Sequence, residues 1–385
     1  MDRSNGKKRI TILGTGLIGG SLGLALKAAR LPGLEVVGHD SDRGAANQAE
    51  KLGAVDRAEH NLPRAVEGAG MVIVAVPILI VREVLQQIAP HLSQGTVVTD
   101  TTSTKAHVMR WANDALPEYV HFVGGHPMAG KENAGITNAE ATLFRGKAYC
   151  ICPAVDASDS AVKSVLGLAR LADAEPLFID PEEHDIYAGA VSHLPLVIST
   201  ALFSMLRSSP AWTDMGIMAS SGFRDVTRLA AGDATMSHGI WATNRDALIH
   251  WLERMTEELG RFRDMLEDAQ DEALLETFLK AQIEREEFQR EPPRRQVEAT
   301  ATAVDSGQAM LNMLVGGALA KNIQRAKQLP ELMRQAPQKE DDEGNRRPSL
   351  AEKIAEDVRR DLDKLEQKRA KKQTDAEDIP GANQT

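Results

Sequence analysis

The stretch KRITILGTGLIGG, residues 8–20, gives the strongest fold signal in the chain. It begins with a short β-branched run and leads into Gly14, Gly16 and Gly19, which have the spacing G-x-G-x-x-G. A strand is predicted before these glycines and an apolar-periodic helix after them, and this context predicts a dinucleotide-binding loop. The alternative is a tight strand-to-helix turn that binds no ligand.

Each glycine of such a loop has its own role. Gly14 permits the tight turn, Gly16 lets the backbone approach a pyrophosphate, and Gly19 lets the helix pack closely on the strand. The free N–H groups at the helix N-terminus then face the phosphates. The predicted loop consists of Gly14, Thr15, Gly16, Leu17, Ile18 and Gly19.

Asp40 ends the second predicted strand, LEVVGHD, at the distance from the glycines where an acidic residue typically contacts the adenosine ribose. A carboxylate there accepts hydrogen bonds from the ribose hydroxyls and repels a 2′-phosphate, so we expect NAD as the cofactor. Val76 and Pro77, which end the run MVIVAVP, complete the predicted cofactor site.

Strands and helices alternate over the first part of the chain. Apolar runs at 71–77 and 95–100 have the pattern of strands buried on both faces, and further strands are expected before 126, at 147–153 and at 174–180. The fold class is therefore α/β, a doubly wound, mostly parallel sheet of Rossmann type. Residues 1–180 are the predicted dinucleotide-binding domain.

No convincing strand follows residue 180, so residues 181–290 are predicted to form an all-helical domain for substrate binding and dimerisation. The segment 190–206 is apolar nearly all round and is expected to be a buried helix, and 246–268 is amphipathic. These helices favour a homodimer interface, with a monomeric helical bundle as the alternative. Residues 291–385 turn polar and are expected to be a mostly disordered charged tail with short helices.

Composition excludes several classes of partner. The 385-residue chain has a formal net charge of −10, which argues against nucleic acid. We found no secretory leader and no run of roughly 20 apolar residues, so no membrane partner is expected. Cys150 and Cys152 lie two apart in a predicted strand and offer too few ligands for a metal site. They indicate reduced core residues of a cytoplasmic protein.

The substrate side is predicted from two strand ends. TDTTSTK, residues 99–105, places Ser103 at the carboxyl end of one strand, and His126 follows the next strand in GGHP. Parallel strands present both to the same crevice, where open α/β sheets bind their ligands. A lone histidine is usually a packed residue, but one at this position is expected to handle a proton.

Five motifs occur in order: GTGLIGGSLG, TDTTSTK, GGHPMAGKENAG, AVSHLP and GFRDVTRLA. With them the chain, from residue 8 to about residue 270, resembles the prephenate and arogenate dehydrogenases of tyrosine biosynthesis. The resemblance implies a Rossmann domain, a helical dimerisation domain, and NAD-dependent oxidative decarboxylation. Nothing in the sequence decides between prephenate and arogenate as substrate.

The resemblance also implies roles for single residues. His126 would be the catalytic histidine and Ser103 would orient it and the nicotinamide, while His193 would lie at the substrate and Arg228 would bind a carboxylate. A polar cluster at the pocket entrance would comprise Glu132, Arg224 and Asp225. The family often has a second histidine after S-H-L-P, where this chain has Leu196.

The implied chemistry suits these residues. A hydride leaves the ring for NAD⁺, CO₂ is lost, and a neutral imidazole with an ordinary pKa near 6.5 accepts the hydroxyl proton. Alternative interpretations are that Arg228 pairs only with Asp225 and that His193 is a packed core residue. Alternative functions are a β-hydroxyacid dehydrogenase, which would use a helical-domain lysine, and a non-catalytic NAD-binding regulator.

Overall fold

The structure, a computed structural model, describes residues 8–131 and 133–293. One eight-stranded sheet has the order β3-β2-β1-β4-β5-β6-β7-β8. Its strands are β1 (Lys8–Leu13), β2 (Leu34–His39), β3 (Arg57–Ala58), β4 (Met71–Val74), β5 (Val97–Asp100), β6 (His121–Pro127), β7 (Ala148–Pro153) and β8 (Glu175–Phe178). The chain reverses direction across the sheet between β1 and β4, so the topological switch point lies at the carboxyl ends of these two strands.

The expected doubly wound, mostly parallel sheet is confirmed. Every pair from β3 to β6 is parallel, and β7 pairs antiparallel with β6. In that pairing His126 lies opposite Cys150. Both cysteines of the chain are buried on β7 and form no disulfide with each other.

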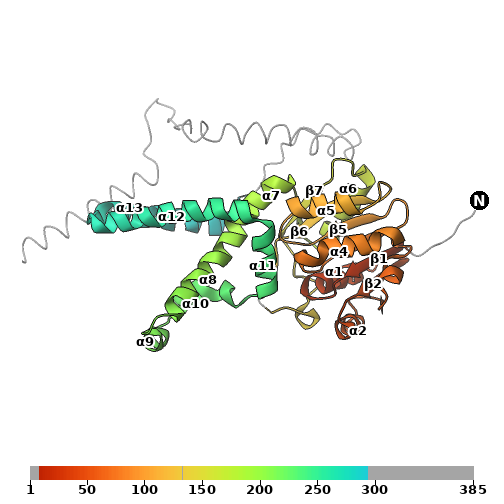
Figure 1. Cartoon of the computed structure of the whole chain (residues 1–385), viewed down its shortest axis with the longest axis horizontal. Helices are drawn as coiled ribbons and strands as arrows, with labels where there is room; N and C mark the ends of the chain where they lie inside the picture. Colours follow the sequence, from red (N-terminus) through yellow and green to blue (C-terminus); the bar gives the residue numbers. More distant parts are fainter. Residues whose placement is uncertain (1–7, 132, 294–385) are drawn as a thin grey trace, which may run out of the picture. The chain divides into compact units, whose positions relative to one another are not determined.

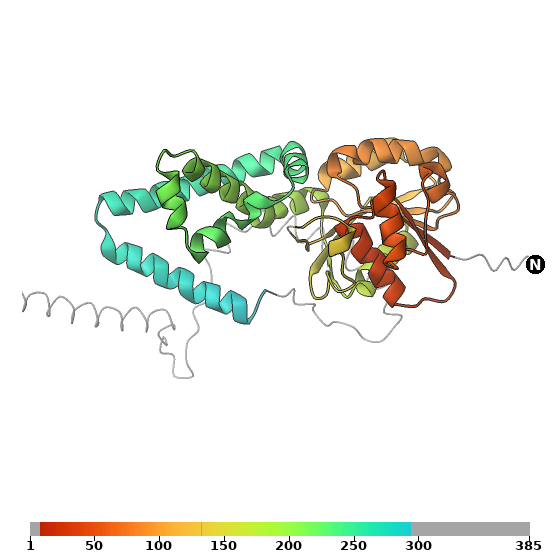
Figure 2. The same cartoon turned by 90° about the horizontal axis from the view of Figure 1, so that it is seen from below.

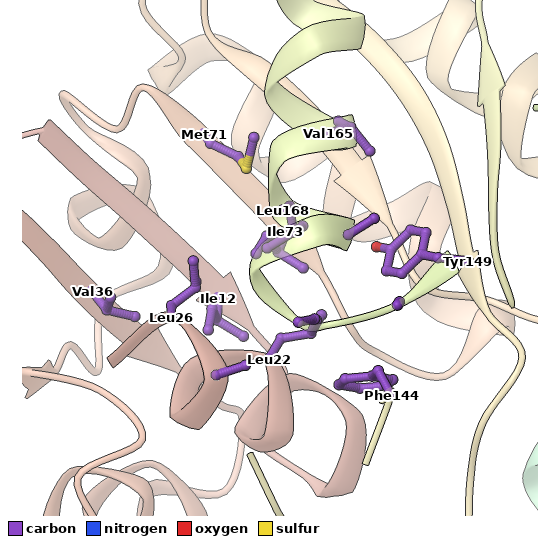
Figure 3. Close-up of a cluster of buried hydrophobic side chains, with 14 of the residues drawn as sticks. Ile12, Leu22, Leu26, Val36, Met71, Ile73, Phe144, Tyr149, Val165 and Leu168 are labelled. Carbon is purple, nitrogen blue, oxygen red and sulfur yellow. The ribbon is translucent and has the colours of Figure 1, made fainter. Parts of the chain in front are cut away.

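Helices cover both faces of the sheet (Figures 1 and 2). On one face, α1 and α6 bury Leu22, Leu26, Val165 and Leu168 against Ile12 and Ile73 of the strands (Figure 3). On the other face, α4 and α5 supply a second buried cluster that includes Val81, Leu85 and Val108. The helices of this part are α1 (Leu17–Ala28), α2 (Arg43–Lys51), α3 (Leu62–Val66), α4 (Ile78–Ile88), α5 (Ala106–Ala115) and α6 (Asp159–Leu171).

From residue 181 to residue 290 the chain is helical, as expected. The elements are α7 (Pro181–Ala188), a π-helical turn (Gly189–His193), α8 (Leu194–Arg207), α9 (Trp212–Ile217), α10 (Ser221–Thr227), a 3₁₀ turn (Arg228–Ala231), α11 (Ala234–Thr243), α12 (Arg245–Glu267) and α13 (Asp271–Arg290). Asp180 starts α7 because its side chain accepts hydrogen bonds from the N–H groups of Glu182 and Glu183.

The expectation that 190–206 is a buried helix is wrong for the single chain. Within α8 only Leu196 and Ser199 are buried, while Val191 just before it is 72% exposed and Met205 is 62% exposed. The helical stretch runs unbroken from Pro181 to Arg207 and is long and apolar enough, by length and composition alone, to cross a membrane. The helix predicted at 190–206 is therefore part of a longer helical stretch, in which the π-helical turn joins α7 to α8. Subunit interfaces have the same composition, since they resemble a divided core.

The described residues divide into two compact units, one ending at Met255 and the other beginning at Thr256, so α12 belongs to both. The predicted boundary between residues 180 and 181 stays a prediction. Most of the predicted tail, residues 294–385, and Glu132 lie outside the described residues.

Candidate active site

The glycine loop has the geometry that a dinucleotide requires. Gly14 has a φ of +88°, and a Cβ there would clash with the carbonyl oxygen of Ala75. A Cβ at Gly19 would clash with the carbonyl oxygen of Gly14, so this residue must be glycine for α1 to approach β1. A Cβ at Gly16 would meet nothing within 4 Å, so the space before this residue is open.

Asp40 lies beside that loop at the end of β2. Its Oδ2 accepts hydrogen bonds from the backbone N–H of Thr15 at 2.7 Å and from the Thr15 hydroxyl at 3.1 Å. Its Oδ1 accepts one from the N–H of Asp42 at 3.0 Å. The carboxylate is half-buried and held in place, and Oδ1, which accepts a single hydrogen bond, retains acceptor capacity toward a ribose.

These residues fit NAD. Leu17, Ile18 and Gly19 form the first turn of α1, which has no acidic side chain to repel a pyrophosphate. Val76 lies against the turn, and its Cγ1 is 3.1 Å from the point that a Cβ on Gly14 would occupy. The exposed Pro77 follows it at the start of α4. The structure thus brings the predicted cofactor residues together at the switch point between β1 and β4.

His126 is the next-to-last residue of β6, in its buried part, and is 7% exposed. The residue before it, Gly125, has no room for a side chain, because a Cβ there would lie 3.0 Å from the Tyr149 hydroxyl and close to the Asp100 carbonyl oxygen. His126 Nδ1 is 2.8 Å from Nε2 of His184, and His184 Nδ1 is 2.9 Å from Oδ1 of Asp185. Three buried polar side chains therefore form one hydrogen-bonded chain.

The charges around His126 oppose its protonation. Burial is the largest cause, and electrostatic interactions with His184, Lys105 and His193 add to it, so the pKa of His126 lies well below its ordinary value. The Lys105 ammonium is fully buried and forms an ion pair with Asp100, which also accepts the N–H of Gly125 at 3.1 Å. His126 is accordingly a neutral imidazole at neutral pH, as a proton acceptor must be.

His193 closes the π-helical turn, a feature common at functional sites. Its Nδ1 lies 2.9 Å from the side-chain nitrogen of Asn244, which can only donate, so the ring proton belongs on Nε2. Nε2 is buried without a hydrogen bond of normal geometry. Burial lowers the pKa of His193 to about 4, and the Asp185 carboxylate and the Ser103 carbonyl oppose that shift only in part.

The other predicted substrate-side residues are not members of the hydrogen-bonded chain that His126 begins. Ser103 is half-buried in the turn before α5, with its carbonyl facing His193. Arg224 and Asp225 are exposed on α10, and Arg228 is exposed at the start of the 3₁₀ turn, so the structure does not bring these three into the buried histidine cluster.

Sequence reasoning assigned no role to the residues behind His126. They are Asp100, Lys105, His184, Asp185 and Asn244, which come from β5, the turn before α5, α7 and the end of α11. The available signal was the pair His184–Asp185 in EEHD at the first turn of the helical region. Within the described residues no group of three or more His, Cys, Asp or Glu could hold a metal ion.

Two family models match the chain. The nucleotide-binding domain of prephenate dehydrogenase matches residues 22–175, and the dimerization domain of prephenate dehydrogenase matches residues 180–280. The chain is 31% identical over 274 residues to a prephenate dehydrogenase of Bacillus subtilis, which covers 71% of this chain and 74% of that protein. It is 29% identical over 277 residues to a cyclohexadienyl dehydrogenase of Zymomonas mobilis, covering 71% and 94%.

Solved structures agree with these matches. The prephenate dehydrogenase from A. aeolicus in complex with hydroxyphenyl propionate and NAD⁺ has a TM-score of 0.69 at 26% identity, covering 74% of this chain and 100% of that one. The Synechocystis arogenate dehydrogenase has a TM-score of 0.63 at 25% identity, covering 73% and 99%.

Proposed function

The chain belongs to the prephenate dehydrogenase family, and from this we infer that it catalyses the NAD-dependent oxidative decarboxylation of prephenate or arogenate in tyrosine biosynthesis. The observation that carries the chemistry is the neutral, buried His126 at the end of β6, on the same edge of the sheet as the glycine loop. NAD⁺ supplies the hydride acceptor for this reaction.

His126 acts as the general base in this proposal. As a hydride leaves the ring carbon that bears the hydroxyl, that hydroxyl must lose its proton. Nδ1 of His126 is turned to His184, which leaves Nε2 as the atom that accepts the proton. The burial that keeps His126 neutral supports this role, because a protonated ring could not serve as a base.

The same proposal gives the other residues binding roles. His193 offers an Nε2–H donor that no residue in the described part of the chain satisfies with normal geometry, which suits a polar atom of the substrate. Ser103 lies in the turn beside it, and the Arg228 guanidinium is suited to a substrate carboxylate. Arg224 and Asp225, one turn before Arg228, remain candidates for the pocket entrance.

A dimerisation domain is part of the chain, and we propose a homodimer through α8 and its neighbours. The exposed side chains of Val191, Phe203 and Met205 support this because a partner subunit would remove them from water. Light scattering at micromolar concentration should give twice the chain mass of 41.8 kDa, and a monomeric mass would contradict the proposal.

We propose a cytoplasmic location, which the two buried thiols support.

Turnover tests the function directly. Purified protein with NAD⁺ should form NADH and release CO₂ when prephenate or arogenate is added, and assaying the two separately decides the preferred substrate. Turnover of a β-hydroxyacid instead would favour a β-hydroxyacid dehydrogenase. NAD⁺ binding without turnover of any of these compounds would favour a regulator.

A further inference from the structure

Two buried residues behind His126 have no role in the reaction as described so far. His184 is 2% exposed and Asp185 is 5% exposed, and both lie on α7. We propose that they are positioning residues that form a proton relay, in which Asp185 and His184 fix the tautomer of His126 and take up the proton from its Nδ1. The relay deepens the proposed function and rests on it for its kinetic consequences.

The direction of the relay follows from the carboxylate. Asp185 Oδ1 accepts the backbone N–H of Lys105 at 2.6 Å, and Oδ2 accepts the N–H of Ala106 at 2.9 Å. These N–H groups begin α5, where the positive end of the helix dipole also favours a carboxylate. With both oxygens acting as acceptors, His184 Nδ1 must carry the hydrogen in its contact with Oδ1.

The remaining tautomers follow in order. A neutral His184 with its hydrogen on Nδ1 has a lone pair on Nε2, so it accepts a hydrogen bond from His126 Nδ1. A neutral His126 with its hydrogen on Nδ1 then has its lone pair on Nε2. The relay therefore makes Nε2 of His126 a proton acceptor, while Nδ1 is hydrogen-bonded to His184.

The proton balance is complete. The substrate hydroxyl proton passes to Nε2 of His126, and the proton on Nδ1 passes to Nε2 of His184. The hydride leaves with its electron pair to NAD⁺. His126 ends neutral with its hydrogen on Nε2, and His184 ends as an imidazolium whose Nδ1–H faces the Asp185 carboxylate.

The charges packed around the two rings make this transfer favourable. Lys105 and His193 both disfavour a positive charge on His126, and Cys150 lies opposite it on β7. Asp100 is engaged by Lys105. A positive charge on His184 also faces His193, but unlike one on His126 it lies in direct contact with the Asp185 carboxylate.

Three variants separate a relay from simple orientation. His184→Gln keeps an acceptor near the position of Nε2 but cannot carry charge, whereas His184→Leu removes both functions. Asp185→Asn removes the negative charge with little change in shape. If the relay operates, all three lower kcat on the order of 10²-fold, with KM changed little.

The pH profile adds a readout that a structural role would not move. In Asp185→Asn the limb along which kcat/KM rises with pH should shift to lower pH. Without the Asp185 carboxylate, a positive charge on the pair His126–His184 is less stable, so the pKa of the pair falls. The half-buried His91, in the 3₁₀ helix Ala89–His91 that follows α4, provides the control variant His91→Gln, which should leave kcat and the limb unchanged. Near wild-type kcat in His184→Gln, or an unmoved limb in Asp185→Asn, overturns the relay.

A second measurement does not depend on turnover. Imidazole ¹⁵N spectra of the full chain, assigned with His126→Asn and His184→Gln, should show both rings with the hydrogen on Nδ1. Hydrogen on Nε2 of either ring overturns the relay. If the wild type turns over neither prephenate nor arogenate, the proposed function fails while these spectra of the wild-type chain still decide the relay.

Discussion

At the scale of single residues, His126 carries the prediction closest to the chemistry. His126→Asn keeps a polar side chain but cannot take up a proton, so kcat should fall by roughly 10²–10⁴-fold. The NAD⁺ dissociation constant should change little, because the glycine loop and Asp40, the residues that we propose bind the cofactor, are unchanged. Steady-state kinetics and fluorescence titration with NAD⁺ measure these two quantities.

The pH dependence of the wild type belongs to the same prediction. The pKa of His126 lies well below 6.5, so the limb along which kcat/KM rises with pH should lie on the acid side of 6.5. The pH dependence of kcat/KM reports the pKa of the essential base in the free enzyme. Because His126→Asn has no such base, the rising limb should be absent in this variant. A variant that keeps the limb would identify another base, with His193 as the next candidate.

Arg228 should act on binding rather than on the chemical step. A charge-assisted hydrogen bond contributes about 1.5–3 kcal/mol, so Arg228→Ala should raise KM about tenfold or more with a smaller effect on kcat. Arg170→Ala, an exposed position at the end of α6, is the matched control and should leave both constants unchanged. A loss confined to kcat would assign Arg228 to the transition state instead.

Sequence could find some of these residues and not others for a physical reason. His126 was predictable because a strand end and a glycine-rich loop surround it in sequence. His184 lies 58 residues further on, and its contact with His126 exists only because α7 packs against the start of α5. Asn244 contacts His193 across 51 residues for the same kind of reason. Such side-chain contacts between distant elements leave no local pattern.

At the scale of elements, the glycine loop separates folding from cofactor binding. Gly19→Ala places a methyl group against the carbonyl oxygen of Gly14 and should lower the melting temperature of the protein. Gly16→Ala places it in open space, so stability should stay near that of the wild type while NAD⁺ binding weakens. Thermal unfolding and NAD⁺ titration of the two variants test this; equal stability of both would contradict the packing argument.

The elements themselves were largely predictable. The sequence patterns indicated seven of the eight strands, and β3 escaped because it contains only two residues, Arg57 and Ala58, which have no apolar pattern. The burial of α8 was misjudged for a different reason. An apolar helix shows that its side chains avoid water, but the sequence does not show whether the same chain or a partner subunit covers them.

At the scale of the whole molecule, the buried neutral histidines make folding stability depend on pH. The pKa of His193 falls from 6.5 in the unfolded chain to about 4 in the folded protein. Between these values the unfolded state binds more protons than the native state, so the free energy of unfolding rises with pH across this window and levels off above 6.5. His126, whose pKa is also lowered, contributes in the same direction.

From pH 7 to pH 5, His193 alone should therefore reduce the free energy of unfolding by about 2 kcal/mol. Urea unfolding at the two pH values, at one protein concentration because a dimer links stability to concentration, measures the change. In His193→Asn the pH dependence should be weaker by about that amount, and in His60→Asn, at an exposed position, it should be unchanged. An unaltered pH dependence in His193→Asn would mean that His193 can take up a proton in the folded protein at little cost, which its burial and its bond to Asn244 argue against.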